Sequence, residues 1–302
     1  MRVLVLGHQG MLARELVPCF AGAGCTVMSR GRPEVDLTQP TSLRQALVDT
    51  QPDLLINAAA YTAVDQSETE PEVALAVNRD GVAHLAVLCR EEGLPLLHVS
   101  TDYVFDGSAS RPYYEEDLAV PLGMYGHSKW EGEEAVRRCH QEHVIVRTSW
   151  VYGCHGRNFV KTMLRFARER EVLRVVDDQY GCPTWSRDVA EALVTICQRI
   201  AQSRDSVPWG TYHFCGAGQT TWYGFAQAII DAARAYEPLR VQEVVPIPTS
   251  AYPTPAKRPA YSVLDCSKIQ AVFGITPRPW RESLHDCLRE LYPCPPISPA
   301  IS

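Results

Sequence analysis

Lysine is scarce in this chain. Only four of the 302 residues are lysine, namely Lys129, Lys161, Lys257 and Lys268, and the formal net charge is −6. The sequence contains no run of basic residues. Because nucleic acid binding depends on clustered positive charge, this composition argues against a nucleic acid polymer as the main partner.

Long apolar runs and paired cysteines are missing as well. No window approaches the roughly 20 apolar residues of a membrane span, and the start of the chain is strand-like rather than a signal peptide. The eleven cysteines are spread out, without a Cys-x-x-Cys pair. An odd number of cysteines without metal-ligand spacing is more typical of a reduced compartment than of a disulfide framework. We therefore expect a cytoplasmic protein without a membrane partner.

The chain begins with a pattern that suits a nucleotide. Residues 2–6 are a short apolar run typical of a buried strand, residues 7–13 form a glycine turn, and a helix is expected from Arg14. A strand, turn and helix in this order place backbone N–H groups and a positive helix end at one point, which favours a pyrophosphate. Gly7 permits the tight turn and Gly10 lets phosphates approach. An ordinary β–α turn looks the same in isolation, so the pattern gains weight only from the alternating strands and helices after it.

Strands and helices alternate through the first half. We expect strands at 26–28, 53–60, 96–101 and 144–149, and helices from a cap at Thr41 or Ser42 to about Val48, at 72–77 and at 82–92. Continuous apolar strands between helices predict an α/β fold with a Rossmann-type, doubly wound parallel sheet. Ligands of such sheets bind at the carboxyl ends of the strands. Gly10, Ala60, Thr101, Tyr125 and Trp150 fall at or just after such ends.

Tyr125 and Lys129 stand four residues apart on a predicted helix and therefore share a face. A lysine beside a phenol favours the phenolate, so we expect Lys129 to lower the pKa of Tyr125 and make it a usable acid near neutral pH. A chance match on a solvated helix is the alternative.

The second half predicts a smaller domain. We expect Ser186 or Thr184 to cap a helix from about Arg187 to Ile200, followed by a strand at 210–214, an amphipathic helix at 222–236 and a proline-rich loop at 246–259. The dinucleotide-binding domain would then comprise residues 1–153 and about 185–216. The smaller α/β substrate-binding domain would comprise residues 154–184 and 217–291, and residues 293–302 would form a loose tail.

Several motifs together resemble a known family. The glycine turn, residues 57–65, residues 100–107, Tyr125-x-x-x-Lys129 and residues 147–152 are similar to the extended short-chain dehydrogenase/reductases. Within that group the chain most resembles the dTDP-4-dehydrorhamnose reductases. The more specific likeness lies in residues 158–163, 177–184, 218–223 and 252–259, and it covers nearly all of residues 1–291.

The resemblance implies roles for individual residues. Tyr125 would protonate the C4 oxygen of a nucleotide sugar, Thr101 would align that oxygen, and Lys129 would hold the nicotinamide ribose. Asp102 and Trp150 would contact the sugar. The plainer alternatives are that Thr101 caps a strand end, Asp102 caps a turn and Trp150 lies in the core. His98 is interpreted as a core residue and His127 as helix surface.

The implied cofactor-binding residues are Gly7, Gly10, Met11, Leu12, Ser29, Arg30, Asp36, Leu37, Ala59, Ala60, Tyr61, Val99, Tyr125 and Lys129.

Cations are required for the diphosphate of such a substrate. Lys257 and Arg258 in the proline-rich loop are the first candidates, and Arg157 and Lys161 are the alternatives.

Cofactor choice depends on the end of the second strand. An acidic residue there would bind both ribose hydroxyls of NADH and repel a 2′-phosphate. The chain instead has Ser29, Arg30 and Arg32, so we expect NADPH, with Ser29 and Arg30 contacting the 2′-phosphate. Use of NADH as well remains the alternative.

Some members of this family carry magnesium at a dimer contact made by carboxylates. Glu15 is present here, but Arg187 lies where a second acidic residue would be wanted, and Asp188 or Glu191 are the substitutes at hand. We therefore expect no metal, while a homodimer is compatible with the resemblance.

Two other functions compete with a reductase. One is a nucleotide-sugar epimerase or dehydratase that recycles tightly held NAD, although Thr101-Asp102-Tyr103 differs from the Thr-Asp-Glu of the dehydratases. The other is an NADP-binding regulatory subunit similar to that of methionine adenosyltransferase.

Overall fold

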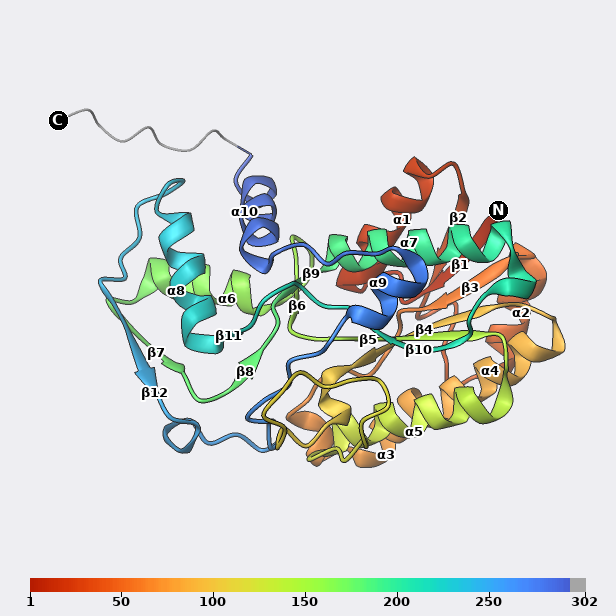
Figure 1. The fold of residues 1–302 in the computed structure, drawn as a ribbon, viewed down its shortest axis with the longest axis horizontal. Helices are drawn as coiled ribbons and strands as arrows, with labels where there is room; N and C mark the ends of the chain where they lie inside the picture. Colours follow the sequence, from red (N-terminus) through yellow and green to blue (C-terminus); the bar gives the residue numbers. More distant parts are fainter. Residues whose placement is uncertain (294–302) are drawn as a thin grey trace.

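The computed structural model describes residues 1–293, so the expected loose tail, apart from Pro293, lies outside the described residues. Its centre is a six-stranded sheet of order β10-β5-β4-β3-β1-β2, in which every neighbouring pair is parallel (Figure 1). The strands are β1 (Arg2–Leu6), β2 (Thr26–Arg30), β3 (Leu54–Asn57), β4 (Leu96–Thr101), β5 (His143–Thr148) and β10 (Gly210–His213).

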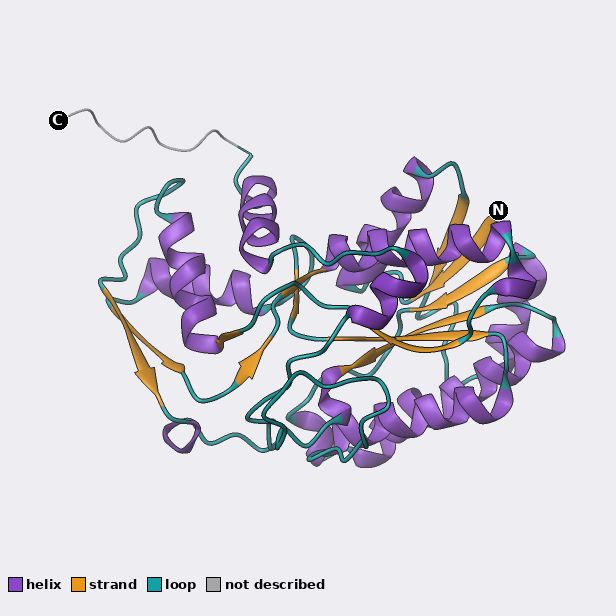
Figure 2. Cartoon of the chain, viewed as in Figure 1, coloured by secondary structure: helices purple, strands orange, loops and turns teal. Residues whose placement is uncertain are grey.

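Apolar residues on both faces of these strands require cover on both sides. Val3, Val5 and Ile56 pack under α1 (Met11–Gly22) and α7 (Ser186–Gln202). Leu4, Leu6 and Leu55 pack on the other side under α2 (Pro40–Thr50), α4 (Gly81–Glu91) and α5 (Met124–Cys139). The two helical layers lie on opposite sides of the strands in Figure 2. The expected doubly wound α/β fold is confirmed.

Three helix starts differ from the prediction, and the first is that of α1, which begins at Met11 rather than at Arg14. Helix α2 begins with Pro40 at its first turn, after Gln39, so neither Thr41 nor Ser42 is the cap. Helix α7 begins at Ser186 after Trp185, without a side-chain cap. The predicted helices at 72–77 and 82–92 are one continuous helical stretch, in which a π-helical turn (Ala76–Asp80) joins α3 (Pro71–Leu75) to α4.

A second core lies beside the sheet domain. It is built on α6 (Phe159–Glu169), α8 (Trp222–Ala233) and α10 (Trp280–Leu291), with Phe225, Leu164 and Leu284 fully or almost fully buried between them. Short strands complete it, as Figure 1 shows: β7 (Val172–Val176) pairs with β12 (Glu243–Ile247), β8 (Tyr180–Gly181) with β11 (Thr220–Thr221), and β6 (Val151–Tyr152) with β9 (Thr184–Trp185).

Two segments of the second half depart from expectation. Residues 243–247 form strand β12, so the predicted loop at 246–259 is partly a strand. Helix α9 (Ser267–Phe273) contributes Ile269 to the core beneath α1 and α7, although the sequence assigned it to the substrate-binding domain. No helix among residues 1–293 is long and apolar enough to cross a membrane.

Candidate active site

The glycine turn has the geometry that a closely approaching ligand requires. Gly7 has φ +105°, and a Cβ placed on it would lie 2.9 Å from the Ala58 carbonyl oxygen. Gly10 precedes α1, and its N–H donates to the Gly7 oxygen at 2.7 Å. The turn therefore packs directly on the end of β3, and a side chain at Gly7 would force the two segments apart, whereas one at Gly10 would press on the Gly7 carbonyl oxygen of the turn itself.

A cavity of about 690 Å³ extends from this turn along the carboxyl ends of the strands to Trp222. It is lined by most of the residues that the sequence assigned to the site. These are Gly7, Gly10, Met11, Leu12, Asp36, Leu37, Ala59, Ala60, Val99, Thr101, Asp102, Tyr125, Lys129 and Trp150.

Three expected cofactor residues do not line this cavity. Ser29 has a buried hydroxyl without a partner among the described residues, and Arg30 is exposed and donates to the Ser29 carbonyl oxygen at 3.1 Å. The N–H of Tyr61 donates to Oδ1 of Asn78 at 2.9 Å. At the end of β2 the lining residues are instead Gly31 and Arg32, opposite His8. The chain leaves the strand after Arg30 and enters a turn at residues 32–34, so the side chains that follow β2 no longer keep the positions that the strand would give them.

Helix α5 brings Tyr125 to the cavity. A Cβ on Gly126 would lie 2.1 Å from the Tyr103 carbonyl oxygen, so this helix packs directly on the turn that follows β4. The Tyr125 and Tyr103 rings meet edge to face, 5.9 Å apart. On that turn, the Thr101 hydroxyl donates to Oδ1 of Asp102 at 3.1 Å and accepts from the N–H of Tyr103 at 3.2 Å. Thr101 and Tyr125 therefore face the same part of the cavity.

The pKa of Tyr125 is shifted in the direction opposite to the prediction. Burial raises the pKa of Tyr125 to about 12, the Thr101 hydroxyl partly offsets the rise, and Asp102 adds to it. Lys129 is not among the groups that shift this pKa, and its Nζ donates to the Val99 carbonyl oxygen, 2.7 Å away. The phenol is therefore protonated at neutral pH, which suits a proton donor.

Lys129 is almost completely buried, with 2% of its surface exposed. Burial lowers the pKa of Lys129 to about 8, and Glu133 one turn further along α5 partly offsets that fall. Glu133 is itself fully buried and accepts hydrogen bonds from Arg147 and Arg137 at 2.7 and 2.6 Å. The lysine therefore changes its charge within the physiological pH range.

Asp102 is buried beside Thr101, and its Oδ2 has no hydrogen-bond partner among the described residues. Burial raises the pKa of Asp102 to about 7, against hydrogen bonds that lower it. A buried carboxyl oxygen that lines a cavity without a partner is suited to a ligand hydroxyl.

Trp150 is part of the cavity wall rather than the core. It has φ +45°, a rare conformation for a bulky residue. Its ring stacks on Trp222, with centroids 3.5 Å apart and planes at 6°. A Cβ on Gly181 would lie 2.3 Å from the Trp150 ring. Trp222 lines the cavity with it and was missed at the sequence level, where it was taken as the start of an amphipathic helix.

The four candidate cations have different positions. Arg258 pairs with Asp65, 2.9 Å away, and neither it nor the exposed Lys257 lines the main cavity. Nζ of Lys161 donates to the Cys154 carbonyl oxygen at 3.1 Å. Arg157 lines the cavity and makes no hydrogen bond or ion pair within residues 1–293.

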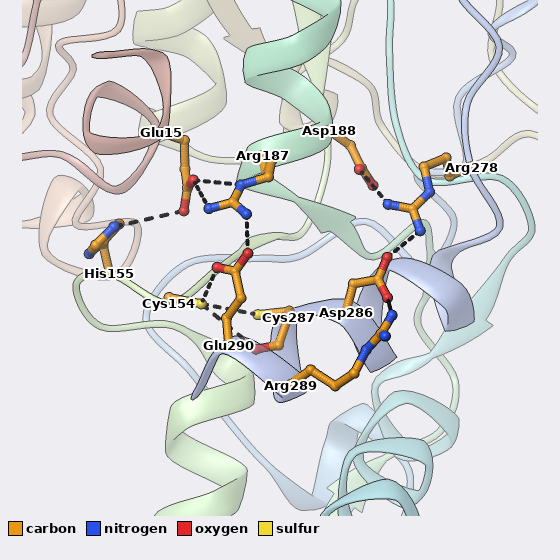
Figure 3. Close-up of polar contacts among 10 residues, drawn as sticks. All are labelled: Glu15, Cys154, His155, Arg187, Asp188, Arg278, Asp286, Cys287, Arg289 and Glu290. Atoms are coloured by element: carbon orange, nitrogen blue, oxygen red, sulfur yellow. Dashed lines mark hydrogen bonds and ion pairs between the residues drawn. The ribbon is translucent and has the colours of Figure 1, made fainter. Parts of the chain in front are cut away.

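The carboxylate of Glu15 is bound by an arginine (Figure 3). Nη2 of Arg187 lies 3.0 Å from Glu15, and another nitrogen of the same guanidinium contacts Glu290 on α10. Among residues 1–293 no three His, Cys, Asp or Glu side chains are grouped to hold a metal ion. At this position the guanidinium supplies the positive charge between the two carboxylates.

Comparison with known proteins agrees with this geometry. Residues 1–292 match the family described as the RmlD substrate binding domain. A dTDP-4-dehydrorhamnose reductase of Burkholderia thailandensis is 43% identical over 296 residues, which are 96% of this chain and 99% of that protein. The chain belongs to the dTDP-4-dehydrorhamnose reductase family.

Solved structures of family members have the same fold. A dTDP-4-dehydrorhamnose reductase of Clostridium acetobutylicum ATCC 824 superposes with a TM-score of 0.88 at 35% identity, over 96% of this chain and 99% of that one. The enzyme of Bacillus anthracis str. Ames, in complex with NADP, gives a TM-score of 0.87 at 35% identity over the same shares. The likeness therefore extends over both halves of the molecule.

Proposed function

We propose that the protein reduces the C4 keto group of dTDP-4-dehydrorhamnose with NADPH, giving dTDP-L-rhamnose. The observation that carries the proposal is the position of the Tyr125 hydroxyl beside Thr101, in the same cavity as the glycine turn, where burial raises the pKa of the phenol. Relatives that are named for this reaction and match almost the whole chain support it.

The residues present fit a dinucleotide. The turn from Gly7 to Gly10 and the N-terminus of α1 supply N–H donors where a pyrophosphate would bind. Ala59 and Ala60 leave room along the end of β3. The bound cofactor supplies the hydride, and the protein must orient the keto group and provide the proton.

Different side chains of the site orient the keto group and provide the proton. Tyr125 donates its proton to the developing C4 alkoxide, while the Thr101 hydroxyl holds the same oxygen in line. Asp102 accepts from a sugar hydroxyl through its free oxygen, and the stacked Trp150 and Trp222 form the wall against the sugar ring. The Lys129 ammonium holds the ribose of the nicotinamide cofactor.

A single assay distinguishes this activity from the two alternatives. Purified protein is mixed with NADPH and dTDP-4-dehydrorhamnose, and absorbance of the reduced cofactor is followed. A reductase consumes NADPH in proportion to substrate, whereas an enzyme that recycles its own NAD shows no net consumption. A regulatory subunit converts nothing, and that result would overturn the proposal.

Arg32 is expected to determine the preference for NADPH. It lines the cavity beyond β2, is exposed, and makes no ion pair within residues 1–293, so it is available for a 2′-phosphate. We expect Arg32→Ala to reduce kcat/KM for NADPH about 10- to 100-fold, the usual scale of a charge-assisted hydrogen bond, and to change NADH little.

Arg30→Ala is the matched control for that measurement, because Arg30 is a neighbouring exposed arginine outside the cavity lining. It is expected to alter kcat/KM for either cofactor less than about threefold. A loss of NADPH preference in Arg30→Ala but not in Arg32→Ala would restore the assignment made from the sequence.

Arg157 is expected to bind the substrate diphosphate. It is the candidate cation that lies in the cavity wall, whereas the Arg258 guanidinium is already paired with Asp65. Arg157→Ala should raise KM for the nucleotide sugar about 10- to 100-fold. Lys257→Ala and Arg258→Ala are the comparison variants, and a larger KM effect in either would return the diphosphate to the proline-rich loop.

A homodimer is part of the same proposal. The support is family membership, and the partly exposed Glu290 and Arg187 leave the ion cluster of Figure 3 accessible from the surface. Light scattering should give twice the 33.6 kDa chain mass. A molar mass equal to one chain at micromolar concentration would overturn it.

A further inference from the structure

His98 is buried in the sheet beside Lys129, where the sequence suggested only a core residue. It lies on β4, in register with Asn57 on the neighbouring strand β3. Both side chains are buried, with 1% and 0% of their surface exposed. Nε2 of His98 lies 3.4 Å from Nζ of Lys129, and Nδ1 lies 3.1 Å from Nδ2 of Asn57. Asn57, His98 and Lys129 therefore form a continuous polar chain under α5.

The orientation of the Asn57 amide is set by the backbone. The N–H of Ala59 donates to Oδ1 of Asn57 at 3.1 Å, so the amide NH₂ must face His98. Nδ1 of His98 then accepts this hydrogen bond. Burial, followed by the nearby Lys129 charge, lowers the pKa of His98 well below its ordinary value, so the ring is neutral. A neutral ring that accepts at Nδ1 carries its proton on Nε2, which is the nitrogen facing Lys129.

This arrangement matches only one charge state of Lys129. An ammonium group has three donors and no acceptor, so it cannot receive the Nε2 proton of His98. A neutral amine has a lone pair and can. The Val99 carbonyl oxygen, 2.7 Å from Nζ, accepts from either form. The polar chain is thus complete only after Lys129 has lost a proton.

We propose that His98, held by Asn57, is a positioning residue that stabilises the amine form of Lys129 and so sets the pH at which Lys129 loses its charge. The proposal rests on the proposed function, in which the Lys129 ammonium holds the cofactor. When Lys129 loses its proton, His98 donates to the resulting amine through Nε2, and the released proton passes to solvent.

Other charged groups around Asn57, His98 and Lys129 also affect the protonation of Lys129. On α5, Tyr125 lies on the cavity side and Glu133 favours the ammonium form. The charges that further disfavour protonation of His98 come from α5 and β5. The titratable and charged groups around His98 and Lys129 are Tyr125, Glu133, Arg137, His143, Arg147 and Asp102.

The first test reads the tautomer directly. Long-range ¹⁵N–¹H spectra of the labelled protein at pH 7 should show His98 protonated on Nε2, with the signal assigned as the one lost in His98→Leu. In Asn57→Asp the new carboxylate still accepts from Ala59 but now also accepts from the ring, so the proton should move to Nδ1. A wild-type ring protonated on Nδ1, or on both nitrogens, would overturn the proposal. This readout needs no turnover, so it stands apart from failure of the proposed activity.

The second test is the pH dependence of NADPH affinity, measured by fluorescence. In Asn57→Asp the bare Nε2 accepts from the ammonium, so the alkaline transition should move up by about one pH unit or more. A direct effect of the added charge would give the same sign, and a double-mutant cycle removes it. The shift caused by Asn57→Asp should fall to less than about half in the His98→Leu background. An equal shift in both backgrounds, or no shift in Asn57→Asp, would contradict the role of His98.

Discussion

Replacing Tyr125 by phenylalanine is expected to lower kcat at least about 100-fold, the usual scale for loss of a general acid. The phenol, with its pKa raised to about 12, is protonated at neutral pH and lies beside Thr101 in the cavity. Phenylalanine keeps the ring that packs on Tyr103 at 5.9 Å, so the fold and the cofactor site should persist. The measurement is kcat for the nucleotide sugar together with Kd for NADPH, which should stay within about threefold.

Tyr114→Phe is the matched control, because Tyr114 is 42% exposed and lies outside the cavity lining. It should leave kcat and Kd unchanged. Turnover of Tyr125→Phe close to that of the wild type would remove Tyr125 from the mechanism and leave the proton donor to be sought elsewhere. A large rise in Kd for NADPH would instead indicate that the substitution disturbed the cofactor site.

Replacing Lys129 by methionine is expected to lower kcat about 10- to 100-fold and to weaken NADPH binding by a similar factor. Methionine approximates the length of the buried stem but removes the ammonium group, which is expected to hold the cofactor in place for hydride transfer. The wild-type affinity for NADPH should also fall as pH rises through about 8, because the ammonium form is present below that value and lost above it. In Lys129→Met this alkaline transition should disappear.

Lys268→Met is the control for lost positive charge. Lys268 pairs with Glu116, 2.9 Å away, and does not line the cavity. Its replacement should leave both kcat and the pH dependence of NADPH binding intact. If Lys129→Met bound NADPH as tightly as the wild type, or kept the transition near pH 8, another group would be responsible for that transition.

The sequence by itself determined the features that depend on neighbours along the chain. An apolar run and a glycine turn are specified within about twenty residues, so β1, Gly7 and Gly10 were placed correctly, and the helix that follows was expected, although α1 begins at Met11 rather than at Arg14. Tyr125 and Lys129 are four residues apart and therefore lie on one face of α5, because residues i and i+4 of any helix share a face. Strands without polar alternation required cover on both faces, which predicted the parallel sheet.

Tertiary structure alone decided which charged side chains are free to bind a ligand in the cavity. Arg258 stands next to Lys257 in a loop that looked suited to a diphosphate, yet it pairs with Asp65, which is 193 residues away. Arg32, not Arg30, reaches the cavity, because the direction of the chain beyond β2 decides which side chain points inward. Stacking of Trp150 on Trp222 joins segments 72 positions apart in the numbering, and no local pattern signals it.

The protonation states of the site were also decided by the tertiary structure. Spacing suggested that Lys129 would lower the pKa of Tyr125, but burial raises the pKa of the phenol and lowers that of the lysine. Desolvation depends on how much of the rest of the molecule surrounds a group, and sequence spacing carries no information about it. For the same reason His98 could not be distinguished from an ordinary core residue until Asn57 and Lys129 were found on either side of its ring.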